Sequence, residues 1–351
     1  MNDTIEMRIG GIGTALPPLS LTQAEVKAFL SSRFGRSLTA KARATLEKVM
    51  DHPGVSRRHF ALDDTSTLLS EDHDTRMARF EHWSVELSVQ AARKAMAAAG
   101  ISAAELGGVV VNTCTGYLCP GIATYLIERL GLPRSVRAYD LVGSGCGGAV
   151  PNIEVASGIL HAVKGGAVLS VSVEVCTAAF QMGNDPSLIV SNALFGDGAA
   201  AAILWARPRG TRIGASASAY LPQERNAVRF EYRNGGLYNR ISPRLPSLVA
   251  AASDELVGRL LRQEGLAIGD IHHWAVHPGG QRIIDAVRDT LKLDEEAMTA
   301  SRAVLAETGN LSSATVWFVL EKVLPQAAPG ERCLCLVYGA GMSVHACLLT
   351  A

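Results

Sequence analysis

Apolar runs, amphipathic stretches and glycine turns alternate along the chain. Short apolar runs at 107–112 (GGVVVN), 167–173 (AVLSVSV) and 199–205 predict strands that are buried on both faces. A broad apolar stripe over 77–99, which ends at Gly100, predicts a long amphipathic helix. This pattern favours a well-buried α/β protein.

The same periodicities predict the other elements of the chain. The expected strands are 7–14, 136–142, 213–220, 272–276, 333–338 and 343–349. The expected helices are 121–130, 148–163 and 246–264, with others starting at Thr22, at about 279 and after Gly309-Asn310. The polar stretches 32–75 and 222–243 show no clear periodicity, so we expect irregular structure there.

The pattern restarts after Pro208. Residues 1–207 and 208–351 each run through a helix, a buried strand, a glycine turn, a helix and a final pair of strands. This similarity suggests an internal duplication. Because no Gly/Ser-rich or Pro-rich linker separates the halves, we expect them to share a core.

Composition narrows the class of protein. The 351 residues include 33 Lys+Arg and 33 Asp+Glu, so no overall field would attract nucleic acid or an anionic membrane. The seven cysteines are odd in number and lie mostly in apolar stretches, which predicts free thiols in a reducing compartment. Without a signal-like start or a long apolar run, we expect a cytoplasmic protein with no membrane span.

Cys146 is a candidate nucleophile. It lies in Gly145-Cys-Gly-Gly148, between a predicted strand and a predicted helix. The glycines permit a tight backbone path and close approach of a substrate. The positive end of the following helix would favour the thiolate form of the sulfur. Taken alone, the same residues also suit a small buried thiol where a strand meets a helix.

Two polar residues of the second half could complete a site. His277 follows a buried strand in Val276-His-Pro-Gly-Gly280, and Asn310 opens a helix in Gly309-Asn-Leu-Ser-Ser-Ala314. Singly, they suit a structural histidine and a helix N-cap. With Cys146 they supply a nucleophile, a base that holds the thiolate as an ion pair, and an amide that donates to an oxyanion.

These three motifs, in this order, resemble the Cys-His-Asn site of type III polyketide synthases, the chalcone and stilbene synthase family. The resemblance runs from about residue 8 to 349 and includes Thr113-Cys-Thr-Gly-Tyr-Leu-Cys-Pro-Gly121, Val173-Glu-Val-Cys176 and Asn192-Ala-Leu-Phe-Gly-Asp-Gly-Ala199. It implies a homodimer with a thiolase fold, in which two βαβαβαββ halves form a five-layer αβαβα arrangement. Residues 1–207 would carry the nucleophile, and residues 208–351 the His and Asn.

The resemblance also implies a reaction. Cys146 would take the acyl group of a starter CoA thioester, while His277 and Asn310 hold malonyl-CoA and stabilise the enolate left by its decarboxylation. Attack of this carbanion on the Cys146 thioester, repeated, would build a poly-β-keto chain. The chain would cyclise to a resorcinol, a pyrone or a related aromatic product. This chemistry requires no metal, flavin or nicotinamide.

Side chains around the site follow from the same resemblance. Phe195 matches the gatekeeping aromatic between the CoA tunnel and the cavity, and it also suits a core Phe beside a tight turn. Cys119 matches the position that enters the partner subunit's cavity, and it also suits simple packing. The other positions expected at the substrate cavity are Cys114, Thr115, Glu174, Cys176, Ala179 and Ser312.

Lys48, Arg57 and Arg58 lie in the segment where the family binds the CoA nucleotide. Cationic donors there would form charge-assisted bonds to phosphate, although such residues are also commonly solvated, and an Arg pair can brace the fold. Val337-Tyr-Gly-Ala-Gly341 departs from the Gly-Phe-Gly-Pro-Gly of plant members, and the second gatekeeper near Tyr238 or Asn239 aligns poorly. The starter and the ring closure are therefore not transferred, and bacterial-style members are closer.

Two rival functions remain at this point. A ketoacyl-carrier-protein synthase of the initiating type shares the fold and the triad but performs one condensation. Its usual His-Gln-Ala-Asn and Asn-Thr-Ser motifs differ from Val-His-Pro-Gly-Gly and Leu-Ser-Ser here. A catalytically silent thiolase-fold partner subunit is disfavoured by the intact Cys146, His277 and Asn310. A zinc site is disfavoured because His272 and His273 would point to opposite faces of a strand.

Overall fold

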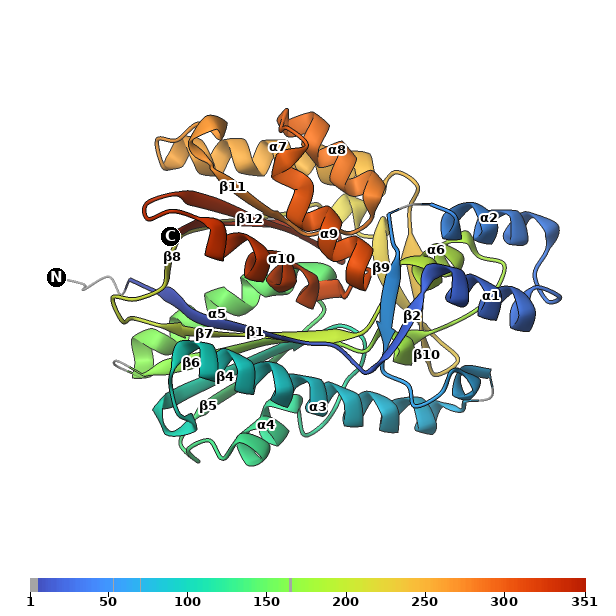
Figure 1. The fold of residues 1–351 in the computed structure, drawn as a ribbon, viewed down its shortest axis with the longest axis horizontal. Helices are drawn as coiled ribbons and strands as arrows, with labels where there is room; N and C mark the ends of the chain where they lie inside the picture. The colour runs from blue at the N-terminus through green and yellow to red at the C-terminus, as the bar shows by residue number, and fades with distance from the viewer. Residues whose placement is uncertain (1–5, 53, 70, 164–165) are drawn as a thin grey trace.

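The computed structural model describes residues 6–52, 54–69, 71–163 and 166–351 (Figure 1). The first five residues of the predicted first half lie outside this range. Within it, nine strands form one mixed sheet in the order β11-β12-β13-β8-β1-β7-β6-β4-β5. The two halves of the sheet meet where β1 pairs with β8 at only two positions, Arg8↔Arg212 and Ile9↔Thr211. The sheet is thus two sheets joined along a short seam.

The first half of the chain supplies one side of this seam. Its strands are β1 Arg8–Ala15, β4 Leu106–Thr113, β5 Arg137–Val142, β6 Ala167–Glu174 and β7 Gly198–Trp205. Its helices are α3 His73–Ala99, α4 Ile122–Leu130 and α5 Ala149–Val163. β4 runs parallel to β5 and β6, whereas β7 is antiparallel to both of its neighbours. The apolar runs that predicted β4, β6 and β7 are buried, while β5 is an exposed edge.

The second half repeats this plan. Its strands are β8 Thr211–Tyr220, β11 His273–Val276, β12 Arg332–Gly339 and β13 Ser343–Thr350. Its helices are α7 Leu245–Gln263, α8 Gln281–Leu291, α9 Thr299–Thr308 and α10 Thr315–Val323. β11 is parallel to β12, and β13 is antiparallel to β12 and β8, as β7 is to its neighbours. In the described ranges no strand of this half corresponds to β5.

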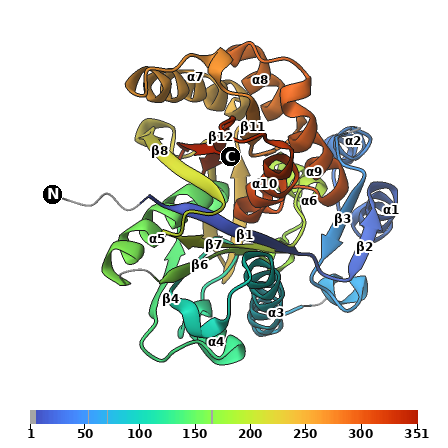
Figure 2. The same cartoon turned by 60° about the vertical axis from the view of Figure 1, so that its left-hand side comes forward.

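Helices cover both faces of both sheets. α3 and α4 pack on the outer face of the first sheet, and α7 and α8 on the outer face of the second (Figures 1 and 2). α5 and α10 lie between the sheets, where Ile153 and Trp317 share one core with residues of β4 and β12. This helix–sheet–helix–sheet–helix order confirms the predicted five-layer α/β architecture.

A smaller group of elements lies at one end of the layers (Figure 1). It comprises β2 Leu19–Thr22, α1 Gln23–Phe34, α2 Ala40–Met50, β3 Arg57–Phe60, α6 Pro186–Leu194, β9 Val228–Arg233 and β10 Gly236–Ile241. The expectation of irregular structure over 32–75 and 222–243 was therefore wrong. In α2, Ala42, Leu46 and Met50 share one buried face against α1 and α6.

The remaining sequence expectations differ from the structure only in detail. α3 begins four residues before the predicted 77, because the Asp72 side chain caps it by accepting from the N–H of Thr75 at 2.8 Å. α9 was not anticipated, and α10 begins at Thr315 after a short 3₁₀ turn. The predicted boundary after residue 207 falls in the connection between β7 and β8. No helix in the described part of the chain is long and apolar enough to cross a membrane.

Candidate active site

Cys146 sits on a turn that brings the backbones of the two halves into contact. The turn, a 3₁₀ segment over Gly145–Gly147, lies between β5 and α5. Gly145 has φ +56°, and a Cβ there would lie 2.7 Å from the backbone N of Ala340. The N–H of Ala340 in turn donates to the carbonyl of Ser144 at 3.2 Å. The glycine is required because both its φ and this close approach exclude a side chain.

The other side of this contact also needs a glycine. A Cβ on Gly339, at the end of β12, would lie 2.2 Å from the carbonyl oxygen of Ser144. The segment that departs from the plant family pattern, Tyr338-Gly-Ala-Gly341, therefore supports the Cys146 turn from the second half. Close backbone packing fixes where the sulfur enters the space between the halves.

His277 enters the same space from the end of β11. Its backbone N–H donates to the carbonyl of Leu336 at 2.8 Å, which continues the pairing with β12. The imidazole is buried, and Tyr338 lies beside it with the two ring centroids 6.1 Å apart. Neither ring nitrogen has a hydrogen-bond partner among the residues that the structure describes. Burial lowers the pKa of His277 to about 3, so the ring is neutral.

Asn310 is held on both its backbone and its side chain. Its N–H donates to the carbonyl of Leu194 at 2.9 Å, and its carbonyl accepts from Gly196 at 3.0 Å, which places it beside Phe195. The side-chain Oδ1 accepts from the N–H of Ser312 at 2.8 Å, and Nδ2 donates to the carbonyl of Gly279 at 3.3 Å. These bonds fix the amide orientation and leave one N–H of Nδ2 for the sulfur of Cys146 or for a ligand.

Burial dominates the ionisation of Cys146. It raises the pKa of the thiol to about 12, while hydrogen bonding from Ser312 and Asn310 lowers this pKa by less. Burial thus favours the neutral forms of both Cys146 and His277. The predicted thiolate, stabilised by the helix end and by an imidazolium, would have to offset this effect of burial, and it stays a prediction.

One cavity brings these three residues together. Cys146, His277 and Asn310 all line a cavity of about 400 Å³, and Phe195 lies in its wall beside Asn310. The same cavity is lined by the predicted positions Cys114, Thr115, Cys176, Ala179 and Ser312. Residues from both halves and from the end elements thus converge on one space.

Glu174 differs from the other predicted cavity positions. It is fully buried, and it is not among the lining residues of the cavities described here. One carboxylate oxygen accepts from the N–H of Cys114 at 3.0 Å and from the hydroxyl of Thr115 at 2.9 Å. The other accepts from the hydroxyls of Ser312 at 3.1 Å and Ser313 at 2.5 Å. Glu174 therefore lies behind the cavity and ties its two walls together.

The residues predicted to bind the CoA nucleotide separate in the structure. Lys48 is exposed and lines the cavity. Arg57 is exposed and donates to the hydroxyl of Ser20 at 3.0 Å, outside the described cavity lining. Arg58 is only 1% exposed, and its Nη1 donates to the carbonyls of Asn192 and Phe195 at 2.8 Å each. Placing Arg58 at a phosphate was wrong, because its guanidinium is enclosed by the protein.

One cation that lines this cavity, Arg282, was not predicted from the sequence. Arg282 is exposed in the first turn of α8 and lines the same cavity as Lys48. Its place after His277-Pro-Gly-Gly280 could have revealed it, because residues that open a helix beside a catalytic loop face the same space. Cys119 is exposed in a loop and lies away from the described cavity linings.

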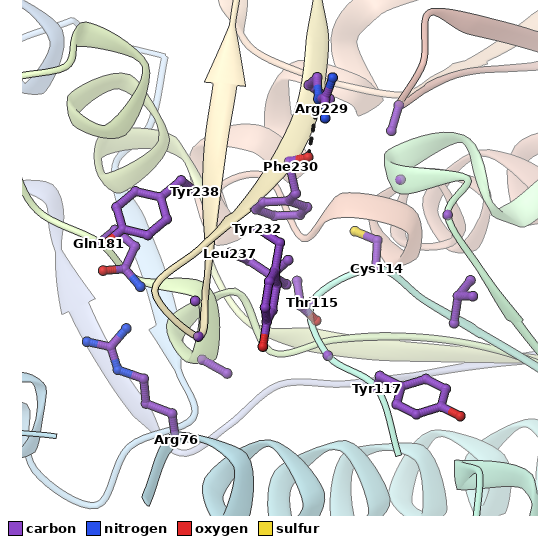
Figure 3. Close-up of a pocket in the computed structure, with 18 of the residues that line it drawn as sticks. Arg76, Cys114, Thr115, Tyr117, Gln181, Arg229, Phe230, Tyr232, Leu237 and Tyr238 are labelled. Atoms are coloured by element: carbon purple, nitrogen blue, oxygen red, sulfur yellow. Dashed lines mark hydrogen bonds between the residues drawn. The ribbon is translucent and has the colours of Figure 1, made fainter. Parts of the chain in front are cut away.

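A second cavity of about 840 Å³ adjoins the first (Figure 3). Both are lined by Cys114, Thr115, Arg229 and Phe230, so these residues lie where the two spaces meet. The β9–β10 hairpin, which was predicted to be irregular, forms much of the second cavity. Its turn, Asn234-Gly235, has φ +47° and +78°, and this Asn-Gly pair within alternating residues was the sequence signal for a hairpin.

Of the two candidate gatekeeper positions, Tyr238 lines the second cavity and Asn239 the first. They alternate across β10, as neighbouring residues of a strand do. Among the described residues no group of His, Cys, Asp and Glu side chains could hold a metal ion. The seven cysteines are free thiols.

Two family descriptions match the chain. "Chalcone and stilbene synthases, C-terminal domain" matches residues 212–351, and "FAE1/Type III polyketide synthase-like protein" matches residues 21–217. A 3,5-dihydroxyphenylacetyl-CoA synthase of Streptomyces toyocaensis is 31% identical over 97% of this chain and 89% of its own length. An alpha-pyrone synthesis polyketide synthase-like protein of Mycobacterium tuberculosis is 27% identical over 97% of this chain and 90% of its own.

Solved structures show the same fold. The crystal structure of PKS-I from the brown alga Ectocarpus siliculosus has a TM-score of 0.91 and 26% identity, and covers 99% of both chains. That of 1,3,6,8-tetrahydroxynaphthalene synthase from Streptomyces coelicolor A3(2) has a TM-score of 0.90 and 23% identity, over 98% of this chain and 99% of that one. These similarities confirm the thiolase fold predicted from the sequence.

Proposed function

Because this chain belongs to the type III polyketide synthases, the malonyl-CoA-condensing acyltransferases of the chalcone and stilbene synthase family, we propose that Cys146, His277 and Asn310 are its catalytic residues. The observation that carries this proposal is their convergence. One residue from the first half and two from the second line a single cavity, although 131 and 33 positions separate them along the chain. Nothing in packing alone requires a thiol, an imidazole without partners and an oriented amide in one place.

In the loading step, the Cys146 thiol passes its proton to His277 and its sulfur attacks the carbonyl of an acyl-CoA thioester. A new C–S bond forms, and the bond to CoA breaks. The CoA thiolate leaves with the proton from His277. Because burial raises the pKa of Cys146 and lowers that of His277, this transfer costs energy in the empty site. Negative charge develops on the bound thioester during this attack. The proton transferred to His277 and the N–H of Asn310 stabilise that charge.

In the condensation step, malonyl-CoA occupies the space that CoA has left. Its C–C bond to the carboxylate breaks, CO2 leaves, and the electron pair becomes an enolate. The Nδ2 N–H of Asn310 and the N–H of His277 donate to the enolate oxygen, which needs neutral donors rather than bases. The enolate carbon attacks the Cys146 thioester, a new C–C bond forms, and the sulfur of Cys146 leaves. Asn310 suits this role because its Oδ1 is already engaged by Ser312.

Repetition and cyclisation of the chain would give a resorcinol, a pyrone or a related aromatic product. Two relatives carry names that denote a dihydroxyphenylacetyl-CoA and an alpha-pyrone, and one neighbour a tetrahydroxynaphthalene. The second cavity, about twice as large as the first, offers room for chain growth beyond the Phe230 boundary. Phe195, which lines the first cavity, is the proposed gate between the CoA tunnel and the cavity.

Substrate and subunit partners follow from the exposed parts of the site. Lys48 and Arg282 at the mouth would bind the CoA phosphates, and no further cofactor is needed.

The uncovered edge strand β5, with exposed Tyr139 and Val142, would pair the chain in a homodimer and bring Cys119 to the partner's cavity. We assign the catalytic Cys to a half spanning 1–207, the His and Asn to 208–351, and the protein to the cytoplasm.

The purified chain, given malonyl-CoA and a panel of acyl-CoA starters without carrier protein, tests this function. We expect products extended more than once, identified by mass spectrometry. Cys146→Ala should abolish them yet still convert malonyl-CoA to acetyl-CoA, because His277 and Asn310 are intact. A requirement for carrier protein, or singly extended products only, would overturn the proposal. If Cys146→Ala still formed extended products, Cys146 would not be the nucleophile.

A further inference from the structure

The second cavity has one polar end. Figure 3 shows Arg76, Gln181 and Tyr238 gathered at one side of it, away from Cys114. Arg76 Nη1 donates to the carbonyl of Phe180 at 2.6 Å, next to Gln181 in sequence. A Cβ on Gly236 would lie 2.6 Å from Gln181 Nε2 and 3.6 Å from the Tyr238 ring, so both lie against the hairpin turn. These contacts place three polar side chains at one location.

This polar end carries an excess of positive charge. Arg76 Nε lies 3.7 Å from a carboxylate oxygen of Glu71, which also contacts Arg79. Two guanidinium groups thus face one carboxylate. Arg79 is 9% exposed and is not among the residues that line the cavity, whereas Arg76, 18% exposed, and Glu71, 3% exposed, both line it. Arg76 is therefore the cation of this group that a ligand in the cavity would meet. A half-buried guanidinium is stabilised by an anion that it can hydrogen-bond.

The neighbouring groups could complete such a site. The side-chain amide of Gln181 and the hydroxyl of Tyr238 make no side-chain hydrogen bond recorded for the described chain. Both can donate to a carboxylate oxygen. Burial lowers the pKa of Arg76, which the neighbouring Tyr238 partly offsets. Two donor side chains, Gln181 and Tyr238, therefore lie beside the Arg76 guanidinium.

The path from this end to Cys146 is less polar. Met77, Ala178 and Leu237 line the same cavity, and Phe230, Cys114 and Thr115 lie where it meets the catalytic cavity. An acyl group attached to Cys146 that crosses this boundary has its methylene carbons against apolar side chains. Its far end then approaches Arg76.

We propose that Arg76, with Gln181 and Tyr238, binds a terminal carboxylate on the acyl group, so that this chain prefers starters derived from dicarboxylic acids over alkyl starters. This inference rests on the proposed function, since it concerns the acyl group carried by Cys146. Guanidinium and carboxylate pair through two parallel hydrogen bonds, which gives both affinity and orientation. The proposal makes Arg76 a specificity-determining residue.

Matched starters test the proposal directly. Three pairs of starters differ only at the chain end, where one member has a carboxylate and the other a methyl group. The pairs are succinyl-CoA with butyryl-CoA, glutaryl-CoA with pentanoyl-CoA, and adipoyl-CoA with hexanoyl-CoA. With malonyl-CoA as extender, we expect kcat/KM for one or more carboxylated starters to exceed that of its alkyl match by about tenfold or more. Arg76→Met should invert this ratio without lowering kcat/KM for the alkyl starter, and Arg76→Lys should retain part of it.

A matched control separates recognition from folding. Arg225 lines the same cavity but is exposed, so Arg225→Met should leave the ratio unchanged. If Arg76→Met lowers both members of a pair equally, Arg76 acts only by holding the Phe180 carbonyl, and the proposal fails. It also fails if the wild-type chain prefers the alkyl starter at all three lengths. Failure of the proposed function looks different, because no starter of either kind would then be extended.

Discussion

The two central helices, α5 and α10, begin at the same site but in different ways. α5 follows the Cys146 turn, which is positioned by backbone contact of Gly145 with Ala340. α10 follows Asn310 and Ser312, which are positioned by side-chain hydrogen bonds. A thiol nucleophile is converted to a thioester and needs room for the acyl group. Neighbouring glycines leave that room because they have no side chain. Oxyanion donors must not reorganise, so bonds on every side suit them.

Both helix starts contain a residue with a left-handed backbone, but at the first it is Gly145 and at the second it is a residue with a side chain. Ser312 has φ +50°, a left-handed backbone that is uncommon for a residue with a side chain. Its N–H is bonded to Asn310, and its hydroxyl lies 3.1 Å from Glu174 and 3.3 Å from the sulfur of Cys114. The first half therefore braces the second through Glu174. The two halves share one plan, but backbone contact positions Cys146 in the first and side-chain hydrogen bonds position Asn310 in the second.

The largest expected effect is that of Asn310→Asp. The carboxylate can still accept from Ser312, but it loses the N–H of Nδ2 and places a negative charge beside the forming enolate. We expect decarboxylation and condensation to fall by about 10²–10³-fold, and acylation of Cys146 by less than about tenfold. Rapid-quench mass spectrometry of the Cys146 acyl-enzyme, together with CO2 release, measures the two steps separately.

Asn192→Asp is the matched control for added charge. Asn192 lines the same cavity, and its Nδ2 donates to the carbonyl of Gln181 at 2.9 Å, away from the reacting atoms. Both steps should change together and little in this variant. If Asn310→Asp slowed acylation as much as decarboxylation, the separation of a mobile nucleophile from fixed donors would be wrong.

Glu174→Gln should have the next largest effect, because it breaks the tie between the two helix starts. A glutamine has one acceptor oxygen, so its NH2 would face donors from either Cys114 and Thr115 or Ser312 and Ser313. We expect the free energy of unfolding to fall by about 2–3 kcal/mol, with a loss of kcat. Urea titrations and steady-state assays measure both quantities.

Glu154→Gln provides the comparison for this carboxylate. Glu154 is exposed on α5 and accepts one bond, from the hydroxyl of Ser216 at 3.0 Å. Its replacement should change stability by less than about 0.5 kcal/mol. Equal effects of the two substitutions would show that Glu174 does not join the walls of the site.

Strands with continuous apolar runs could be predicted from sequence, because their burial on both faces leaves a local signal. β4, β6 and β7 are such strands. α2 and the β9–β10 hairpin could not be predicted in the same way, since neither contains a continuous apolar run and the hairpin strands are mostly half-buried. Their apolar positions acquire meaning only against α1, α6 and the cavity. Asn234-Gly235 was the one local sign of the hairpin.

The candidate site was predicted as a set of residues but not as an electrostatic environment. Cys146, His277 and Asn310 were identified through motifs and a resemblance, which carry residue types and order. The burial that raises the pKa of Cys146 and lowers that of His277 arises when the halves close over the site. Arg58 illustrates the same limit, because an arginine in a polar segment gave no sign that α6 and Gln23 would enclose it.

The smallest expected effect concerns the ionisation of His277, in the second half. Since the pKa of His277 is lowered to about 3 from its ordinary 6.5, the unfolded chain binds a proton that the folded chain does not bind between these values. The free energy of unfolding therefore falls as the pH drops below 6.5. This residue should contribute a loss of about 1 kcal/mol between pH 7.5 and 5.5, and His277→Gln should remove it. Parallel stability curves for His277→Gln and wild type would mean that folding does not shift the pKa of His277. A wild-type stability that instead rises relative to His277→Gln as the pH falls would mean that the folded ring is protonated, as in the thiolate–imidazolium pair predicted from the sequence.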